Sequence, residues 1–307
     1  MNKFVISYII FLFSFSSAVS QDTLMPIILL DDVVISELND GFSIQDFVNY
    51  VKNDTTFYMG FKHLRYYSHD YESELIVFDK NNNQIGSINK WGTHYSDTEK
   101  AWIVNDSIIK KGKIFKRNGK SKFYTPKAFD EVFFPNDTIN VSLKISKEKN
   151  MNESQNLRDA KTIGFSIGSS DTEQNRGGVR SKLSIFNQEM QKYYDYIISD
   201  TIYNGRPCYV FTVRLKSDLS DRNKEKTLIR KLVSFFDKKY FNVIFREYKF
   251  KYSTWLFNID MRVVVDMDYI NEKHLPVNIY YNGFWNVLFF KPEKAVFLLK
   301  NTNYIVE

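Results

Sequence analysis

The stretch FNIDMRVVVDMDY, residues 257–269, alternates apolar and polar side chains almost without a break. A period of two predicts a β-strand with one dry and one wet face. At ~3.3 Å per residue this strand would run about 40 Å, so we expect its antiparallel sheet to twist and curl. The dry face carries Phe257, Ile259, Met261, Val263, Val265, Met267 and Tyr269, and the wet face carries Asn258, Asp260, Arg262, Asp266 and Asp268.

Composition agrees with a β-rich fold. The chain has 307 residues, of which 43% are hydrophobic and 17% aromatic, with 12 glycines and 6 prolines. Such values exclude collagenous and wholly disordered proteins and favour β structure. Strands are predicted on both sides of the opening stretch, at 72–79, 84–91, 101–109, 112–117, 122–125, 208–216, 231–237, 240–252, 275–281 and 284–290.

Turn signals separate these strands. Asn118-Gly119 is the strongest hairpin signal, and Asp237-Lys238-Lys239 and Tyr281-Asn282-Gly283 also have turn composition. The predicted fold class is therefore α+β and β-dominated: a strongly curved, half-barrel-like antiparallel sheet with a few short helices packed on its concave side.

Helical spacing is confined to short segments. Ser43, with Asp46 three residues on, can cap a helix that contains Phe47 and Val51. A second apolar stripe contains Phe57, Phe61 and Leu64, and residues 127–134 form a short aromatic helix or turn. Each helix has one apolar face, which the concave sheet could bury.

The N-terminus has the pattern of a signal peptide over residues 1–20. Lys3 precedes the apolar run 4–15, and Ala18-Val19-Ser20 provides small residues for cleavage. A single membrane anchor is the alternative, although the run is shorter than the ~20 residues that span a bilayer. We expect an exported protein of the periplasm or outer-membrane periphery, with an arm at 21–42 and a single domain at 43–307.

No pattern predicts catalysis, a metal or a cofactor. Gly164-Phe-Ser166-Ile-Gly168 matches a nucleophile elbow, but no apolar helix follows it, so a flexible loop is the better interpretation. Asp260, Asp266 and Asp268 share the wet face, where a solvated surface alternating with Arg262 is the default and a glycosidase pair the alternative. The four histidines lack metal-ligand spacing, and Cys208 is the single cysteine. The net charge of +6 is spread among acids, and nucleic acid is not an expected partner.

Three parts of the chain carry a resemblance: residues 200–210, residues 235–237 with 241–248, and residues 275–276 with 280–285. They resemble a family of exported Bacteroidota proteins, and the rhythm of the C-terminal strands is similar to the LolA/LolB-type lipoprotein-carrier fold. That resemblance implies a half barrel capped by helices, with acyl chains held on the concave face.

Two functions follow as expectations. The first is a non-enzymatic protein that binds an apolar ligand, a lipid or a lipoprotein on the concave face. The alternative is a structural accessory of an outer-membrane or cell-surface complex, with a sealed core and with edge strands or the N-terminal arm used for pairing. The candidate ligand-binding residues are Phe245, Trp255, Phe257, Met261 and Met267.

Overall fold

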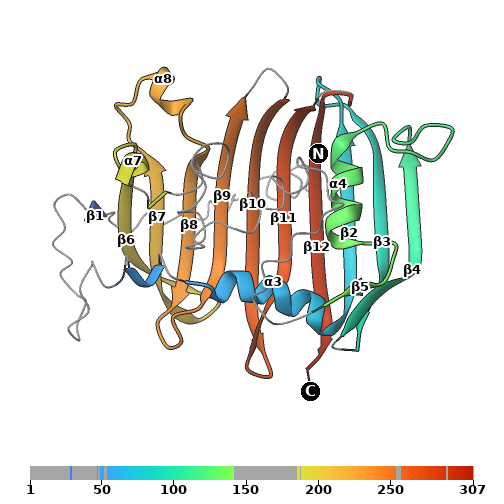
Figure 1. Ribbon diagram of the computed structural model, residues 1–307, viewed down its shortest axis with the longest axis horizontal. Helices are drawn as coiled ribbons and strands as arrows, with labels where there is room; N and C mark the ends of the chain where they lie inside the picture. The colour runs from blue at the N-terminus through green and yellow to red at the C-terminus, as the bar shows by residue number, and fades with distance from the viewer. Residues whose placement is uncertain are drawn as a thin grey trace, which may run out of the picture.

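The computed structural model describes residues 28–29, 47, 49–51, 54–97, 99–141, 185–186, 188–253, 257–287 and 290–306 (Figure 1). The predicted signal peptide, the Ser43 cap, the segment 164–178 and Trp255 lie outside the described residues.

In the described part of the chain, twelve strands form one antiparallel sheet in the order β1-β6-β7-β8-β9-β10-β11-β12-β2-β3-β4-β5. The predicted β-dominated, curved sheet with short helices on its concave side is confirmed (Figure 1). The strands are β1 (Ile28–Leu29), β2 (Ser68–Phe78), β3 (Gln84–Ser96), β4 (Lys100–Gly112), β5 (Ile139–Asn140), β6 (Tyr194–Tyr203), β7 (Arg206–Leu215), β8 (Ile229–Asp237), β9 (Val243–Ser253), β10 (Phe257–Ile270), β11 (Lys273–Val287) and β12 (Glu293–Ile305).

The opening stretch forms β10, the sixth strand in this order. Ile259, Met261, Val265 and Met267 are buried, at 1–7% exposed. The side chains of Asp260 and Arg262 are exposed on the other face. The predicted alternation is therefore confirmed. A register shift against β11, between Asp266 and Met267, bends the strand near its end.

Strand β12 connects the C-terminal strands to the β2–β3 hairpin, and the sequence pattern did not predict this strand. β12 pairs with β11 on one side and with β2 on the other. The β2–β3–β4 meander of the N-terminal half therefore continues the β6–β11 meander of the C-terminal half in one sheet.

Two helices lie across the concave face: α3 (Thr56–Tyr66) and α4 (Tyr124–Phe133) (Figure 1). A helical segment at 47 and 49–51 precedes them, and its Phe47 ring lies 5.5 Å from Tyr209 and 5.7 Å from Phe236. The remaining described helices are the short α7 (Gln188–Gln191) and α8 (Asp221–Lys224).

Two local predictions were wrong. Asn282-Gly283 is no turn, because β11 continues through it from Lys273 to Val287. Gly283 is there for space: a Cβ at this position would collide with the Tyr281 ring and lie 2.8 Å from Met261 Cβ. Strands were also expected on both sides of Asn118-Gly119. The turn itself is present, with Gly119 at φ +78, but its flanks share a single bridge and the predicted strand 122–125 leads into α4.

Candidate ligand-binding face

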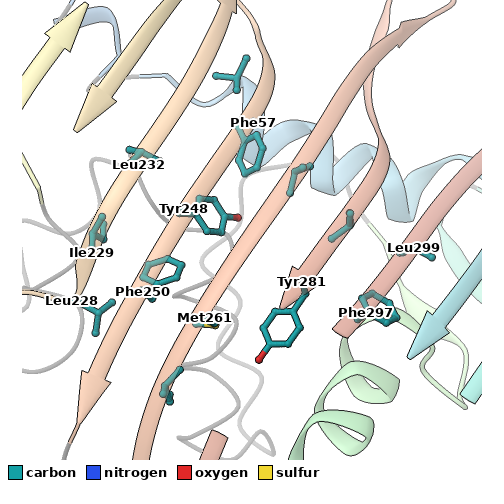
Figure 2. Close-up of a cluster of buried hydrophobic side chains, with 14 of the residues drawn as sticks. Phe57, Leu228, Ile229, Leu232, Tyr248, Phe250, Met261, Tyr281, Phe297 and Leu299 are labelled. Carbon is teal, nitrogen blue, oxygen red and sulfur yellow. The ribbon is translucent and has the colours of Figure 1, made fainter. Parts of the chain in front are cut away.

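The concave face between β8 and β12 is a continuous apolar surface. On it lie the side chains of Ile229, Leu232, Tyr248, Phe250, Met261, Tyr281, Phe297 and Leu299, all at most 7% exposed. Figure 2 shows these residues on adjacent strands, with Phe57 from α3 above them. Because paired residues of an antiparallel sheet share a face, the Met261–Phe250 and Met261–Gly283 pairs place β9, β10 and β11 in register there.

Helix α3 faces this surface with three buried residues, Phe57, Gly60 and Leu64, and its partly buried Phe61 also packs against the core. A Cβ at Gly60 would collide with the Cε methyl of Met267, so the centre of the helix contacts the sheet through the tip of a methionine. Methionine side chains have three rotatable bonds and adapt to irregular space, which makes this contact deformable.

A buried ion pair holds the N-terminal end of α3. The Asp54 carboxylate lies 3.7 Å from the Arg246 guanidinium of β9. Asp54 Oδ1 also accepts a hydrogen bond of 2.9 Å from the Thr56 backbone N–H two residues on, as in an Asx-turn. Arg246 Nε donates to Ser234 Oγ, and its guanidinium lies 4.2 Å from the centre of the Phe57 ring.

Histidines connect the middle of α3 to the start of β11. His63 Nδ1 lies 3.0 Å from the His274 carbonyl oxygen. His274 Nε2 lies 2.7 Å from the Val243 carbonyl oxygen. Burial lowers the pKa of both imidazoles, which favours their neutral forms. Polar contacts at Asp54 and His63 therefore flank the apolar contact of α3.

Helix α4 covers the β11–β12 side of the face. The Phe129 ring lies 4.6 Å from Phe297 and 4.9 Å from Tyr281. Beneath the start of the helix, Glu293 is 0% exposed and accepts hydrogen bonds from the backbone N–H and the hydroxyl of Thr125. Burial raises the pKa of Glu293 to about 7 despite these bonds.

A small cavity lies between α3, α4 and the β2–β3 hairpin. Its volume is about 30 Å³, and its walls include His69, His94 and Leu299. The two imidazoles are stacked, with ring centroids 4.7 Å apart, and His94 Nδ1 has no hydrogen-bond partner. Burial lowers the pKa of His69 to about 3 and that of His94 to about 4. The space fits a water molecule rather than an organic ligand.

The predicted ligand-binding residues have different positions. Met261 and Met267 lie on the concave face. Phe257 begins β10 opposite Val287, and its side chain is not among those described. Phe245 pairs with Asp266 and lies on the opposite, convex face. There its ring stacks on Phe235 at 4.6 Å and contacts Tyr203 at 5.3 Å, so Phe245 is not part of the concave wall.

The three aspartates of the wet face each have their own partner. Tyr203 donates a hydrogen bond of 2.7 Å to Asp266, Arg206 one of 2.6 Å to Asp268, and Lys251 lies 3.8 Å from Asp260. These contacts fit the solvated, ion-paired interpretation of the face.

Sequence spacing did not reveal the stacked histidines. His69 and His94 lie 25 positions apart but are direct partners in the β2–β3 hairpin. The register of the β2–β3 hairpin is the signal that would have placed these two histidines together. Within the described part of the chain, no group of three or more His, Cys, Asp or Glu side chains could hold a metal ion.

Comparisons with known proteins give little. No protein-family model and no curated protein matches the chain. Two solved structures are similar: a DUF1329 family protein from Desulfovibrio piger (9% identity, TM-score 0.25) and an outer membrane lipoprotein-sorting protein domain from Vibrio parahaemolyticus (9% identity, TM-score 0.24). Each match covers 81% of this chain and 90% of the other. These TM-scores are too low to support a conclusion about this protein from either structure. The similarity to lipoprotein carriers that the sequence suggests therefore stays a prediction.

No helix in the described ranges combines the length and the apolar character that a membrane span needs.

Proposed function

We propose that this is an exported, non-enzymatic binding protein whose concave face accommodates an apolar ligand, such as the acyl chain of a lipid or of a lipidated partner. The observation that carries the proposal is the contact between Gly60 of α3 and the tip of Met267. Because a methionine side chain can change its rotamer, the support beneath the centre of α3 can rearrange to admit a ligand.

The ligand would lie between α3 and strands β10 and β11, beside Met261 and Met267. Each buried CH₂ group contributes about 0.8 kcal/mol, so an acyl chain of about ten carbons would gain enough to offset displacement of a short helix. The polar contacts of Asp54 and His63 would then act as the hinges of α3. In this proposal Phe257 and Trp255 extend the wall, residues 43–307 form the binding domain, and the setting is the periplasm or the outer-membrane periphery.

The test is retention and binding of acyl chains by the protein from its native envelope. Native mass spectrometry with lipid extraction should show a co-purifying acyl species in near-stoichiometric amount. A fluorescent fatty acid should bind the delipidated protein, and Met267→Phe should weaken binding by about tenfold, equivalent to ~1.4 kcal/mol.

The matched control is Leu298→Phe, because Leu298 is 45% exposed on the convex face. It should leave the affinity unchanged. A clean apo mass together with no fatty-acid binding would reject the proposal and leave a sealed core.

One observation favours a second candidate function, an interaction module that pairs through its sheet edge. β5 pairs with β4 only at Lys100 and Ala101, and the rest of β4 has no second strand partner among the described residues. Its exposed apolar side chains are Trp102, Val104, Ile108 and Ile109, at 37–45% exposed. An exposed apolar edge strand is a template for an added strand.

A photo-crosslinker placed at Val104 in cells should then join a partner chain, whereas one at Leu298, which is 45% exposed on the interior strand β12, should not. Deleting residues 21–42 tests the N-terminal arm separately, since it should abolish partner capture and leave the fold if the arm is the pairing element. Equal labelling from positions 104 and 298 would argue against the edge.

A further inference from the structure

Four cations stand directly opposite one another on the convex face. Arg214 of β7 pairs with Lys231 of β8, Lys231 pairs with Lys249 of β9, and Lys249 pairs with Arg262 of β10. Neighbouring strands lie about 4.8 Å apart, so this cation row spans about 14 Å. Like charges that face each other across a sheet destabilise it, and a row of four needs an explanation.

Carboxylates pair with three of the four cations in the row. Asp195 lies 3.5 Å from Arg214, and Glu247 lies 2.6 Å from Arg262 and 3.9 Å from Lys231. Lys249, within the row, has no ion pair among the described residues. Its side chain is exposed, so it is available to a ligand.

The β10 end of the cation row opens into a groove. The groove has a volume of about 490 Å³, within the range of small-molecule sites. Its walls supply four cations against one carboxylate, two amides and one aromatic ring. They are formed by Lys249, Lys251, Asn258, Asp260, Met261, Arg262, Asn282, Gly283, Phe284 and Lys294.

The register explains how these side chains converge. Lys251, Asp260, Phe284 and Lys294 are successive partners across β9, β10, β11 and β12. They form a second row beside the first, in which the Lys251 ammonium lies 3.8 Å from Asp260. Lys294 approaches from the far strand, where its Nζ donates to Asn82 Oδ1 at 3.3 Å. The groove therefore has cations at both ends and the Phe284 ring between them.

We propose that this groove binds a small molecule that carries phosphate groups. Arginine offers a planar fork that matches a phosphate, and lysine offers a compact positive charge. A phosphate between Lys249 and Arg262 would relieve the repulsion within the cation row. Lys251 and Lys294 would receive a second anionic group, and the apolar part of the ligand would lie on Phe284. The charged side chains of the site lie on the opposite face of the sheet from the acyl site, and Met261 of the concave face also borders the groove.

The experiment is a calorimetric titration of the full-length mature protein with pyrophosphate at low ionic strength. The wild-type protein should bind saturably, and added salt should weaken binding because exposed charges are screened. The double variant Lys249→Gln/Arg262→Gln should lose tenfold or more in affinity, since each charge-assisted hydrogen bond contributes about a factor of ten. Lys249→Arg should retain binding.

The matched control is Lys116→Gln/Lys239→Gln, which removes the same charge from exposed turns outside the groove. It should keep the wild-type affinity. Absence of saturable binding, or an equal loss in both double variants, would overturn the proposal.

Two further arms distinguish the source of the phosphate. Comparable affinity for soluble glycerol phosphate and for phosphatidylglycerol vesicles identifies a free phosphorylated metabolite, and a strong preference for the vesicles identifies a lipid headgroup. The groove variant should bind the fluorescent fatty acid as the wild type does, so failure here leaves the acyl proposal standing.

Discussion

The Asp54 carboxylate and the Arg246 guanidinium, 3.7 Å apart, have side chains only 1% and 6% exposed. This ion pair joins the start of α3 to the middle of β9 in the interior of the protein. Two charges in such a place are stable together and costly apart, because the loss of one leaves the other without compensation. The position of α3 on the sheet depends on this pair.

Arg246→Met should therefore destabilise the protein by about 3–5 kcal/mol, the usual cost of breaking a buried pair from one side. The double variant Asp54→Asn/Arg246→Met should recover part of that loss, because no buried charge then remains. Urea denaturation of the full cycle measures both effects. The exposed pair Lys127–Glu131, 3.7 Å apart on α4, is the control, and Lys127→Met should change stability by less than ~1 kcal/mol. Similar costs for Arg246→Met and Lys127→Met would contradict the argument.

Gly283 of β11 and Gly60 of α3 should differ in how much their substitution by alanine changes stability. A Cβ at Gly283 meets the buried Tyr281 side chain, whose hydroxyl accepts a hydrogen bond from the Trp285 indole N–H, and the cost of such overpacking is about 1–3 kcal/mol. A Cβ at Gly60 meets the mobile tip of Met267, and alanine also gains up to ~1 kcal/mol of helix propensity. Gly60→Ala should therefore be close to neutral. Equal losses in thermal denaturation would show that α3 is packed as rigidly as the sheet, which would also weaken the acyl-binding proposal.

Glu293 should make the protein less stable as pH rises from about 4.5 to about 7. Its folded pKa is raised to about 7 from an ordinary value of 4.5, so the folded state holds a proton that the unfolded state has lost. A shift of this size corresponds to about 3 kcal/mol at most. Glu293→Gln should remove that slope from a series of urea denaturations. Glu131→Gln on the exposed side of α4 should leave the slope in place, and an unchanged slope in Glu293→Gln would exclude Glu293 as its source.

Much of the sheet could be predicted because alternation records which face of a strand is buried. The prediction failed where the buried face carries a charge. In β9, Arg246 lies on the concave face and Phe245 on the convex face, the reverse of what hydropathy indicates. Arg246 is compensated by Asp54, far away in the sequence, and Phe245 is covered by Tyr203 and Phe235. Neither partner can be identified from local pattern alone.

The same limit explains the other failures. Asn282-Gly283 has the composition of a turn, but both residues lie within β11. The role of Gly283 is to leave room for the side chain of Tyr281, two residues earlier in the same strand. The stacked histidines and the cation row consist of residues that become neighbours only through strand register. Spacing along the chain predicts elements, whereas these sites are set by the pairing between elements.

The histidine pair should give the protein a second pH dependence, opposite in sign to that of Glu293. The folded pKa values of about 3 for His69 and about 4 for His94 lie below the unfolded value of 6.5, so the unfolded state binds more protons as pH falls. Their stabilising contribution is complete above about pH 6.5 and is lost progressively towards pH 4. His94→Phe keeps a ring against His69 and should flatten the acid limb of the stability curve, at some cost at neutral pH. In the Glu293→Gln background the opposing slope from Glu293 should be absent. His94→Phe should then reduce the slope of the acid limb. An acid limb that is unaltered by His94→Phe in that background would show that the His69–His94 pair does not control acid unfolding.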